Sequence, residues 1–246
     1  MSMRATAGLG AGVLLLAGLL AGCGDDGGDD DGGDGGDVAF ADRSYDDIKS
    51  AAIEAMGSLD SVHVDASVSS GGQEATLDIS MSADGSCTGT VAFGGVGAEV
   101  LQTADGAWYK PDQGLLEQQF GREAAGVGEF VGDHWVVDSS GEVTPNNCDL
   151  ESFIEQVTSD EEEESDAEVA GVEELDGEEV VKLTFTNDDG DGAVYVLTEG
   201  EHYIAQFEIE GEDPGTVAFS EFDEEVEVET PAEDDIVDLA DYRPQG

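Results

Sequence analysis

The chain has 246 residues, of which 60 are acidic and 7 are lysine or arginine, and its formal net charge at pH 7 is −53. Because so negative a protein is repelled by nucleic acid and by anionic lipid surfaces, the composition argues strongly against both as partners. Its length and its 39% share of hydrophobic residues fit one core of ordinary size.

The N-terminal residues 1–22 have the pattern of a secretory signal. Arg4 is followed by an apolar run, residues 11–20, and then by small residues that precede Cys23. This run is shorter than the ~20 apolar residues that cross a bilayer. Residues 20–23 resemble the lipobox of bacterial lipoproteins, which implies cleavage before Cys23 and a diacylglyceryl group on its sulfur. The alternative is an ordinary secretory signal that leaves Cys23 as a thiol.

A lipid on Cys23 anchors the chain to the membrane, because each buried methylene contributes ~0.8 kcal/mol. The expected location is therefore the cell envelope, at the extracytoplasmic face of the cytoplasmic membrane. Residues 23–43 are predicted to be a disordered tether, since residues 24–37 contain only glycine and aspartate and cannot bury apolar surface. Calcium-binding repeats of glycine and aspartate carry an apolar residue at a fixed position, which this stretch lacks.

The charge is distributed so that every acidic residue follows Cys23, whereas lysine is limited to Lys49, Lys110 and Lys182. Self-repulsion of this size destabilises a compact state unless salt screens it. We therefore expect the host to live at high salt.

Two further cysteines, Cys87 and Cys148, remain once Cys23 is assigned to the anchor. In an oxidising compartment a pair of cysteines favours one disulfide. The alternative, a catalytic thiol, requires an electropositive setting, and neither cysteine has basic neighbours in the sequence.

The predicted elements begin with a helix over residues 45–57, capped by Ser44 and ended by Gly57. Alternating apolar and polar residues then predict strands over 61–68, 77–81, 88–93, 98–103 and 108–110, separated by glycine-containing turns. A short helix over 115–120, a strand over 134–137 and a helix over 149–157 follow, and the acidic run 160–164 is expected to be solvated. Strands resume over 169–175, 180–186, 193–198, 202–210, 216–222 and 226–228, and a last helix is expected over 234–241.

This order predicts a single domain over residues 44–246, of the α+β class, with one large antiparallel sheet and helices gathered on one face. A strongly curved sheet needs something inside its concave face, which the helices or a ligand can supply.

Several landmarks together resemble a known family, the actinobacterial lipoproteins of the LolA-like type related to the LppX and LprG group. They are residues 59–64, Asp84-Gly85 before 89–91, residues 105–110, Trp135 and residues 174–178. The resemblance implies an incomplete antiparallel barrel draped over helices, with an apolar cavity that carries a lipid or lipoglycan.

No catalytic signature is present, so we predict that the chain is not an enzyme and needs no cofactor or metal. His63, His134 and His202 fit no metal-ligand spacing, and residues 187–192 lack the acid at the twelfth position of a calcium loop. The expected function is a membrane-anchored, monomeric binder or carrier of an apolar or amphipathic ligand. Candidate residues for the cavity are Leu115, Leu116, Phe120, Phe130 and Ile154.

The alternative is a structural or interaction lipoprotein, in which the same apolar residues fill the core and an acidic surface binds a basic partner. The volume of the interior distinguishes the two hypotheses.

Overall fold

The structure, a computed structural model, describes residues 39–139, 148–158, 165–187, 190–211 and 213–243. The predicted signal, Cys23 and the glycine–aspartate stretch lie outside these residues, as does the acidic run 160–164.

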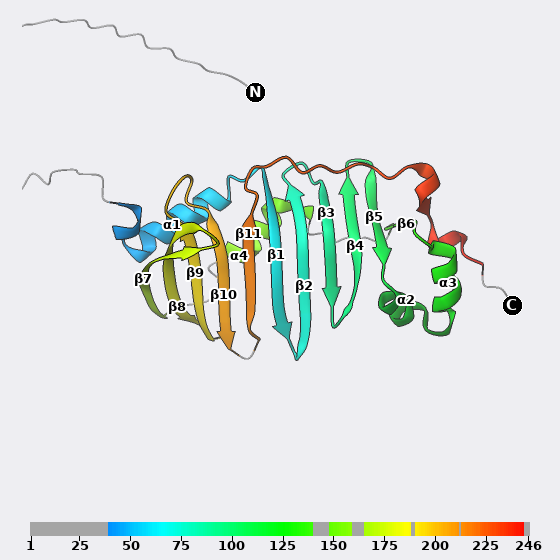
Figure 1. The fold of residues 1–246 in the computed structure, drawn as a ribbon, viewed down its shortest axis with the longest axis horizontal. Coiled ribbons are helices and arrows are strands. Elements are labelled where there is room, and N and C mark those ends of the chain that lie inside the picture. Colours follow the sequence, from blue (N-terminus) through cyan, green and yellow to red (C-terminus); the bar gives the residue numbers. More distant parts are fainter. Residues whose placement is uncertain (1–38, 140–147, 159–164, 188–189, 212, 244–246) are drawn as a thin grey trace, which may run out of the picture. The chain divides into compact units, whose positions relative to one another are not determined.

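Twelve strands in the described part of the chain form one sheet, in the order β12-β6-β5-β4-β3-β2-β1-β11-β10-β9-β8-β7 (Figure 1). Neighbouring strands are antiparallel except for the short pair β12 and β6. Their bounds are β1 (Ser61–Ser70), β2 (Gln73–Ser82), β3 (Cys87–Phe93), β4 (Val96–Thr103), β5 (Gly106–Pro111), β6 (Trp135–Val137), β7 (Ser165–Leu175), β8 (Glu178–Asn187), β9 (Gly190–Leu197), β10 (Ile204–Gly211), β11 (Gly215–Ser220) and β12 (Ile236–Val237).

The sheet consists of two meanders, β1 to β6 and β7 to β11, joined by the pairing of β1 with β11. Two-residue turns connect β1 with β2, β3 with β4, β4 with β5 and β7 with β8, whereas residues 112–134, which include two helices, lie between β5 and β6. Gly71-Gly72, Gly94-Gly95 and Asp176-Gly177 have positive φ at both central residues, the conformation that a type I′ hairpin turn requires. Glycine adopts this conformation without a steric penalty, which explains its frequency at these turns.

Four α-helices are described: α1 (Tyr45–Met56), α2 (Gln113–Phe120), α3 (Ala124–Val131) and α4 (Leu150–Thr158). The Ser44 hydroxyl accepts a hydrogen bond from the Asp47 backbone N–H and caps α1 as predicted. Helix α1 contacts β7 and β10, α4 places Phe153 beside Phe219 of β11, and α2 packs on β4, β5 and α3 (Figure 1).

The main core lies between these helices and one face of the sheet, which we call the inner face. It joins Ile48 and Met56 of α1, Val64 of β1, Ile79 of β2 and Ile154 of α4, all nearly inaccessible to solvent. The opposite, outer face carries a smaller apolar cluster of Val180, Ala193 and Tyr195. The predicted α+β class, a large curved antiparallel sheet with helices on its concave face, is confirmed.

The ordered part of the domain includes residues ahead of the predicted boundary at Ser44. A 3-10 turn, η1 (Phe40–Asp42), buries the Phe40 ring, which stacks on His202 with the ring centroids 3.6 Å apart. The guanidinium of Arg43 lies 5.2 Å from the centre of the same ring. One aromatic side chain therefore orders the end of the segment that composition assigns to the tether.

Two predictions near the C-terminus are wrong. Residues 226–228 do not form a strand, because the segment crosses the ends of β1 to β5 instead of running beside one of them (Figure 1). The predicted helix over 234–241 is replaced by η4 (Glu233–Asp235), β12 and η5 (Leu239–Asp241). Here Ile236 and Val237 pair with Trp135 and Val136, and this ladder holds the chain extended.

Helix α3 was not predicted, because Gly126 and Gly128 lower the helical propensity of its sequence. Only the first of these glycines lies in a close contact. A Cβ at Gly126 would lie 2.5 Å from the Tyr242 hydroxyl, whereas one at Gly128 would meet Leu116 of α2 at an ordinary contact distance of 3.5 Å. Tertiary packing therefore overrides local propensity in this helix.

Candidate functional site

The most continuous apolar feature of the inner face is a row of side chains that crosses nine neighbouring strands in register. We call it the inner row; its members are Val169, Leu183, Val194, Phe207, Val217, Ala66, Leu77, Val91 and Ala98. All but Leu183 and Ala98 are half-buried, and all nine belong to the main core or pack against it. Alternation along each strand places them on one face.

Burial falls along the strands from one side of the inner row to the other. On one side, Val64, Ile79 and Val100 are completely buried. On the other side, Val68 and Ala75 are half-buried, and Phe93, in the same register, is 49% exposed. The helices therefore cover one end of the strands, and apolar surface stays accessible toward the other end.

The five predicted cavity residues all join the main core. Leu116 and Ile154 are buried, and Leu115, Phe120 and Phe130 are half-buried against the same cluster. The structure does not bring them together around either of the hollows described below. Sequence reasoning missed the inner row because its register connects strands that are distant in the sequence.

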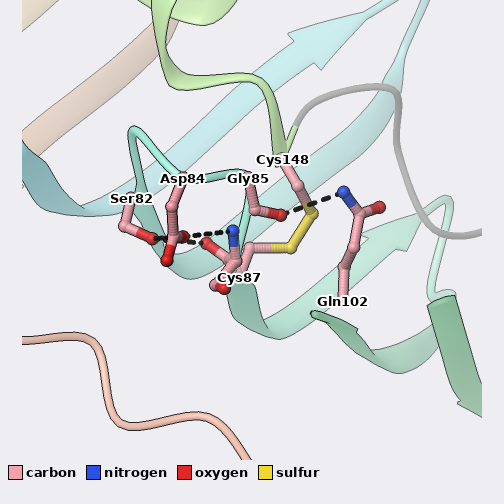
Figure 2. The surroundings of a disulfide bond; sticks show 7 residues. Ser82, Asp84, Gly85, Cys87, Gln102 and Cys148 are labelled. Atoms are coloured by element: carbon pink, nitrogen blue, oxygen red, sulfur yellow. Dashed lines mark hydrogen bonds between the residues drawn. A yellow bond between two sulfur atoms is a disulfide. The ribbon is translucent and has the colours of Figure 1, made fainter. Parts of the chain in front are cut away.

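A disulfide between Cys87 and Cys148 links β3 to the segment that leads into α4, two residues before that helix begins (Figure 2). The two Cα atoms are 5.5 Å apart, within the range that a disulfide spans. Nearby, Gln102 donates a hydrogen bond of 3.0 Å to the Gly85 carbonyl (Figure 2). Asp84 accepts hydrogen bonds from Ser82 and Ser86, which lower the pKa of its carboxyl group. Both cysteines are buried, so the bond holds the start of α4 against the inner face.

The N-terminus of α4 is capped by Asp149. Its carboxylate accepts hydrogen bonds from the backbone N–H and the hydroxyl of Ser152, and these bonds lower the pKa of Asp149. This is the usual N-cap arrangement for a helix start.

The segment that follows β11 is tied to the sheet at several points. Asp223 accepts hydrogen bonds from the Tyr203 hydroxyl at 2.6 Å and from the Asp60 backbone N–H at 2.8 Å. The bond to Asp223, with partial burial, raises the pKa of Tyr203 to about 12. Farther along, Thr230 donates a hydrogen bond to Asp105 in the β4–β5 turn.

Two hollows on the outer face are polar. The larger, about 360 Å³, is lined by five carboxylates together with Lys182 and threonine side chains. Across it, Lys182 donates a hydrogen bond to the Tyr195 hydroxyl, which donates one of 2.6 Å to Glu208. The first of these bonds is the main cause that raises the pKa of Lys182. The smaller hollow, about 200 Å³, contains His63 among four glutamates.

The three histidines are far apart in the sequence, His63 in β1 and His134 and His202 just before β6 and β10. Each ring Nδ1 has a partner: Ser80 for His63, the Val131 carbonyl for His134 and the Leu197 carbonyl for His202. Among the described residues, no group of three or more metal-ligating side chains converges. Within that same part of the chain, no helix combines the length and apolarity needed to cross a membrane.

Comparison with known proteins gives no match to a family model and none to a curated protein sequence. Solved structures do match. LprF from Mycobacterium bovis is 14% identical, with a TM-score of 0.55 over 76% of this chain and 97% of its own. The lipoprotein LppX from Mycobacterium tuberculosis is 16% identical, with a TM-score of 0.48 over 79% of this chain and 100% of its own. The likeness to LprF confirms the predicted LolA-like fold.

Proposed function

We propose that this chain is a lipid-anchored protein of the cell envelope that binds an apolar or amphipathic, lipid-like molecule on the inner face of its sheet. The observation that carries the proposal is the inner row. Apolar side chains lie in register across nine strands, and seven of the nine stay half-buried instead of being sealed by the helices. Acyl chains laid along this surface would complete its desolvation, which favours binding in proportion to the area covered.

The anchor supports this function. Cys23 with its lipid would attach the chain to the extracytoplasmic face of the cytoplasmic membrane, as a monomer on an anionic tether. Fourteen residues of glycine and aspartate (24–37) reach ~20 Å as a coil and ~50 Å when fully extended. The domain would therefore stay close to a reservoir of lipid-like ligands without needing a cofactor, and its role would be sequestration or transfer without catalysis.

The test is native mass spectrometry of the full chain with Cys23→Ala, expressed in a lipid-bearing host. We expect a folded protein that carries a bound lipid-like molecule. Leu77→Gln, which places an amide in the inner row, is expected to reduce occupancy. Thr76→Gln is the matched control, because Thr76 is exposed on the outer face of the same strand.

Consistently ligand-free protein, in native spectra and in solvent extracts alike, would refute the proposal. Urea unfolding of both variants separates lost binding from lost folding. Equal occupancy in the Leu77→Gln and Thr76→Gln variants would place the ligand elsewhere.

A second candidate function is a structural or interaction lipoprotein with a filled core. It is favoured by the packing of Leu116, Ile154 and the three neighbouring predicted cavity residues into the main core. Its acidic surface would then bind a basic envelope partner, and the ligand-free outcome above would support this reading.

A further inference from the structure

The sequence contains two runs of uncharged residues that the fold brings together at one end of neighbouring strands. In a domain with acids almost everywhere, residues 85–98 contain no charged side chain. This is the longest such run after residue 44, and the next longest is residues 66–73. These runs contain the turns of two hairpins, Gly71-Gly72 between β1 and β2 and Gly94-Gly95 between β3 and β4.

The two hairpin tips are neighbours, because β2 pairs with both β1 and β3. The Gly94 backbone N–H donates a hydrogen bond of 2.8 Å to the Glu74 carbonyl at the start of β2, which links the second tip to the first hairpin. We call residues 66–73 and 91–98 the neutral rim.

Carboxylates bound the neutral rim on both sides and are tied to its backbone. Asp213 accepts a hydrogen bond from the Gly71 N–H at 3.0 Å, and Asp112 accepts one from the Gly97 N–H at 2.7 Å. The Glu74 side chain is exposed and lies on the outer-face side of β2. The uncharged sector is therefore limited to the two tips and to the inner face behind them.

The neutral rim is also where the inner row reaches solvent. Val68, Ala75, Phe93 and Val96 lie opposite one another across β1 to β4, one position beyond Ala66, Leu77, Val91 and Ala98 on the inner face. The Phe93 ring is 49% exposed and stands at the end of this apolar surface. An isolated exposed phenylalanine needs no explanation, but one that extends a continuous apolar surface marks a contact site.

We infer that the neutral rim is the place where the domain contacts a lipid bilayer, with Phe93 inserted at its surface, and where the ligand enters and leaves the inner row. This inference rests on the proposed function. A bilayer fits because apolar side chains gain by entering its interface, while the carboxylates elsewhere on the domain are repelled by anionic headgroups. Among the described residues at this end of the strands, the two hairpin tips form the sector that can bring apolar side chains to the membrane without bringing charged ones.

The test measures transfer of a self-quenched fluorescent phospholipid from phosphatidylcholine vesicles to the full chain carrying Cys23→Ala. Phe93→Asp is expected to slow transfer by roughly tenfold, the order set by withdrawing an aromatic side chain from an apolar surface. The amount of label bound at equilibrium should not change. Val172→Asp is the matched control, since Val172 is 50% exposed on the edge strand β7 and the change in charge is the same.

A second measurement does not depend on ligand uptake. In this measurement, the Phe93→Trp variant is mixed with vesicles that contain quencher lipids, labelled near the headgroup, and no fluorescent phospholipid. These lipids should quench the fluorescence of the new indole. Unquenched fluorescence, or equal transfer rates for Phe93→Asp and Val172→Asp, would overturn the inference. If the parent chain takes up no label while the indole is quenched, the proposed ligand fails and the membrane contact stands.

Discussion

Reduction of the Cys87–Cys148 disulfide should destabilise the domain strongly. The bond closes a loop with a sequence separation of 61 residues. In the chain-entropy description, a cross-link of this length removes enough conformational freedom from the unfolded state to stabilise the fold by about 4 kcal/mol. Domains are commonly stable by about 5–15 kcal/mol, so this bond supplies a large share of the total.

The assay is urea unfolding of the Cys23→Ala chain, followed by the fluorescence of Trp108 and Trp135, with and without reductant. The midpoint should fall on reduction. In thermal unfolding, the melting temperature should fall by about 8–16 °C, at about 2–4 °C per kcal/mol for a domain of this size. The double variant Cys87→Ala, Cys148→Ala is the control, because it removes the buried sulfur atoms as well as the bond.

Comparison of the two perturbations separates their physical causes. If loop closure dominates, the reduced protein and the double alanine variant should lose similar stability. A much larger loss in the variant would indicate that packing around the buried sulfurs matters more. If the free energies of unfolding of the reduced and oxidised proteins differ by less than about 1 kcal/mol, the loop-closure reasoning is refuted.

Three further predictions concern charge and backbone packing. Added sodium chloride should raise the melting temperature, because it screens the repulsion within a chain of net charge −53; a melting temperature that stays constant or falls would contradict this. The pKa of Tyr203 rises from 10.0 to about 12 beside Asp223, so its neutral form stabilises the fold below pH 10 and this contribution is lost as the pH rises to about 12. The urea midpoint should therefore fall over this interval, and Tyr203→Phe should flatten the fall. Gly89→Ala would place a Cβ 2.1 Å from the Asp78 carbonyl oxygen and should destabilise by about 1–3 kcal/mol, whereas Gly57→Ala, with its nearest neighbour at 3.5 Å, should be tolerated in the same unfolding assay.

The sequence predicts the strands well wherever one face is polar. Val62, Val64 and Ala66 alternate with His63 and Asp65, and this period of two fixes which side chains face the core. The dipeptides Gly71-Gly72 and Asp176-Gly177 also predict hairpin turns from the local sequence, because their residues tolerate the positive φ angles that these turns require. The helix α1 is equally local, because its cap and apolar stripe lie within one segment.

The elements that the sequence does not predict correctly depend on contacts between distant segments. Ile236 is extended because it pairs with Trp135, and the absence of a side chain at Gly126 of α3 leaves room for the Tyr242 hydroxyl. The same limit applies to the candidate site. Val91 and Phe207 belong to one row only after β1 has paired with β11, which no local pattern reveals. The exposure of Phe93 likewise depends on which helices cover the inner face.

The pairing of β1 with β11 also determines the order in which the sheet can assemble. Strand β1 can form its hairpin with β2 as soon as both are available, but its other edge must wait for residues 215–220, near the end of the chain. Such distant pairing slows folding and leaves an unpaired edge on which other chains can add strands. During that interval, the net charge of −53 keeps neighbouring chains apart. The same repulsion that destabilises the folded domain therefore opposes aggregation while the chain folds.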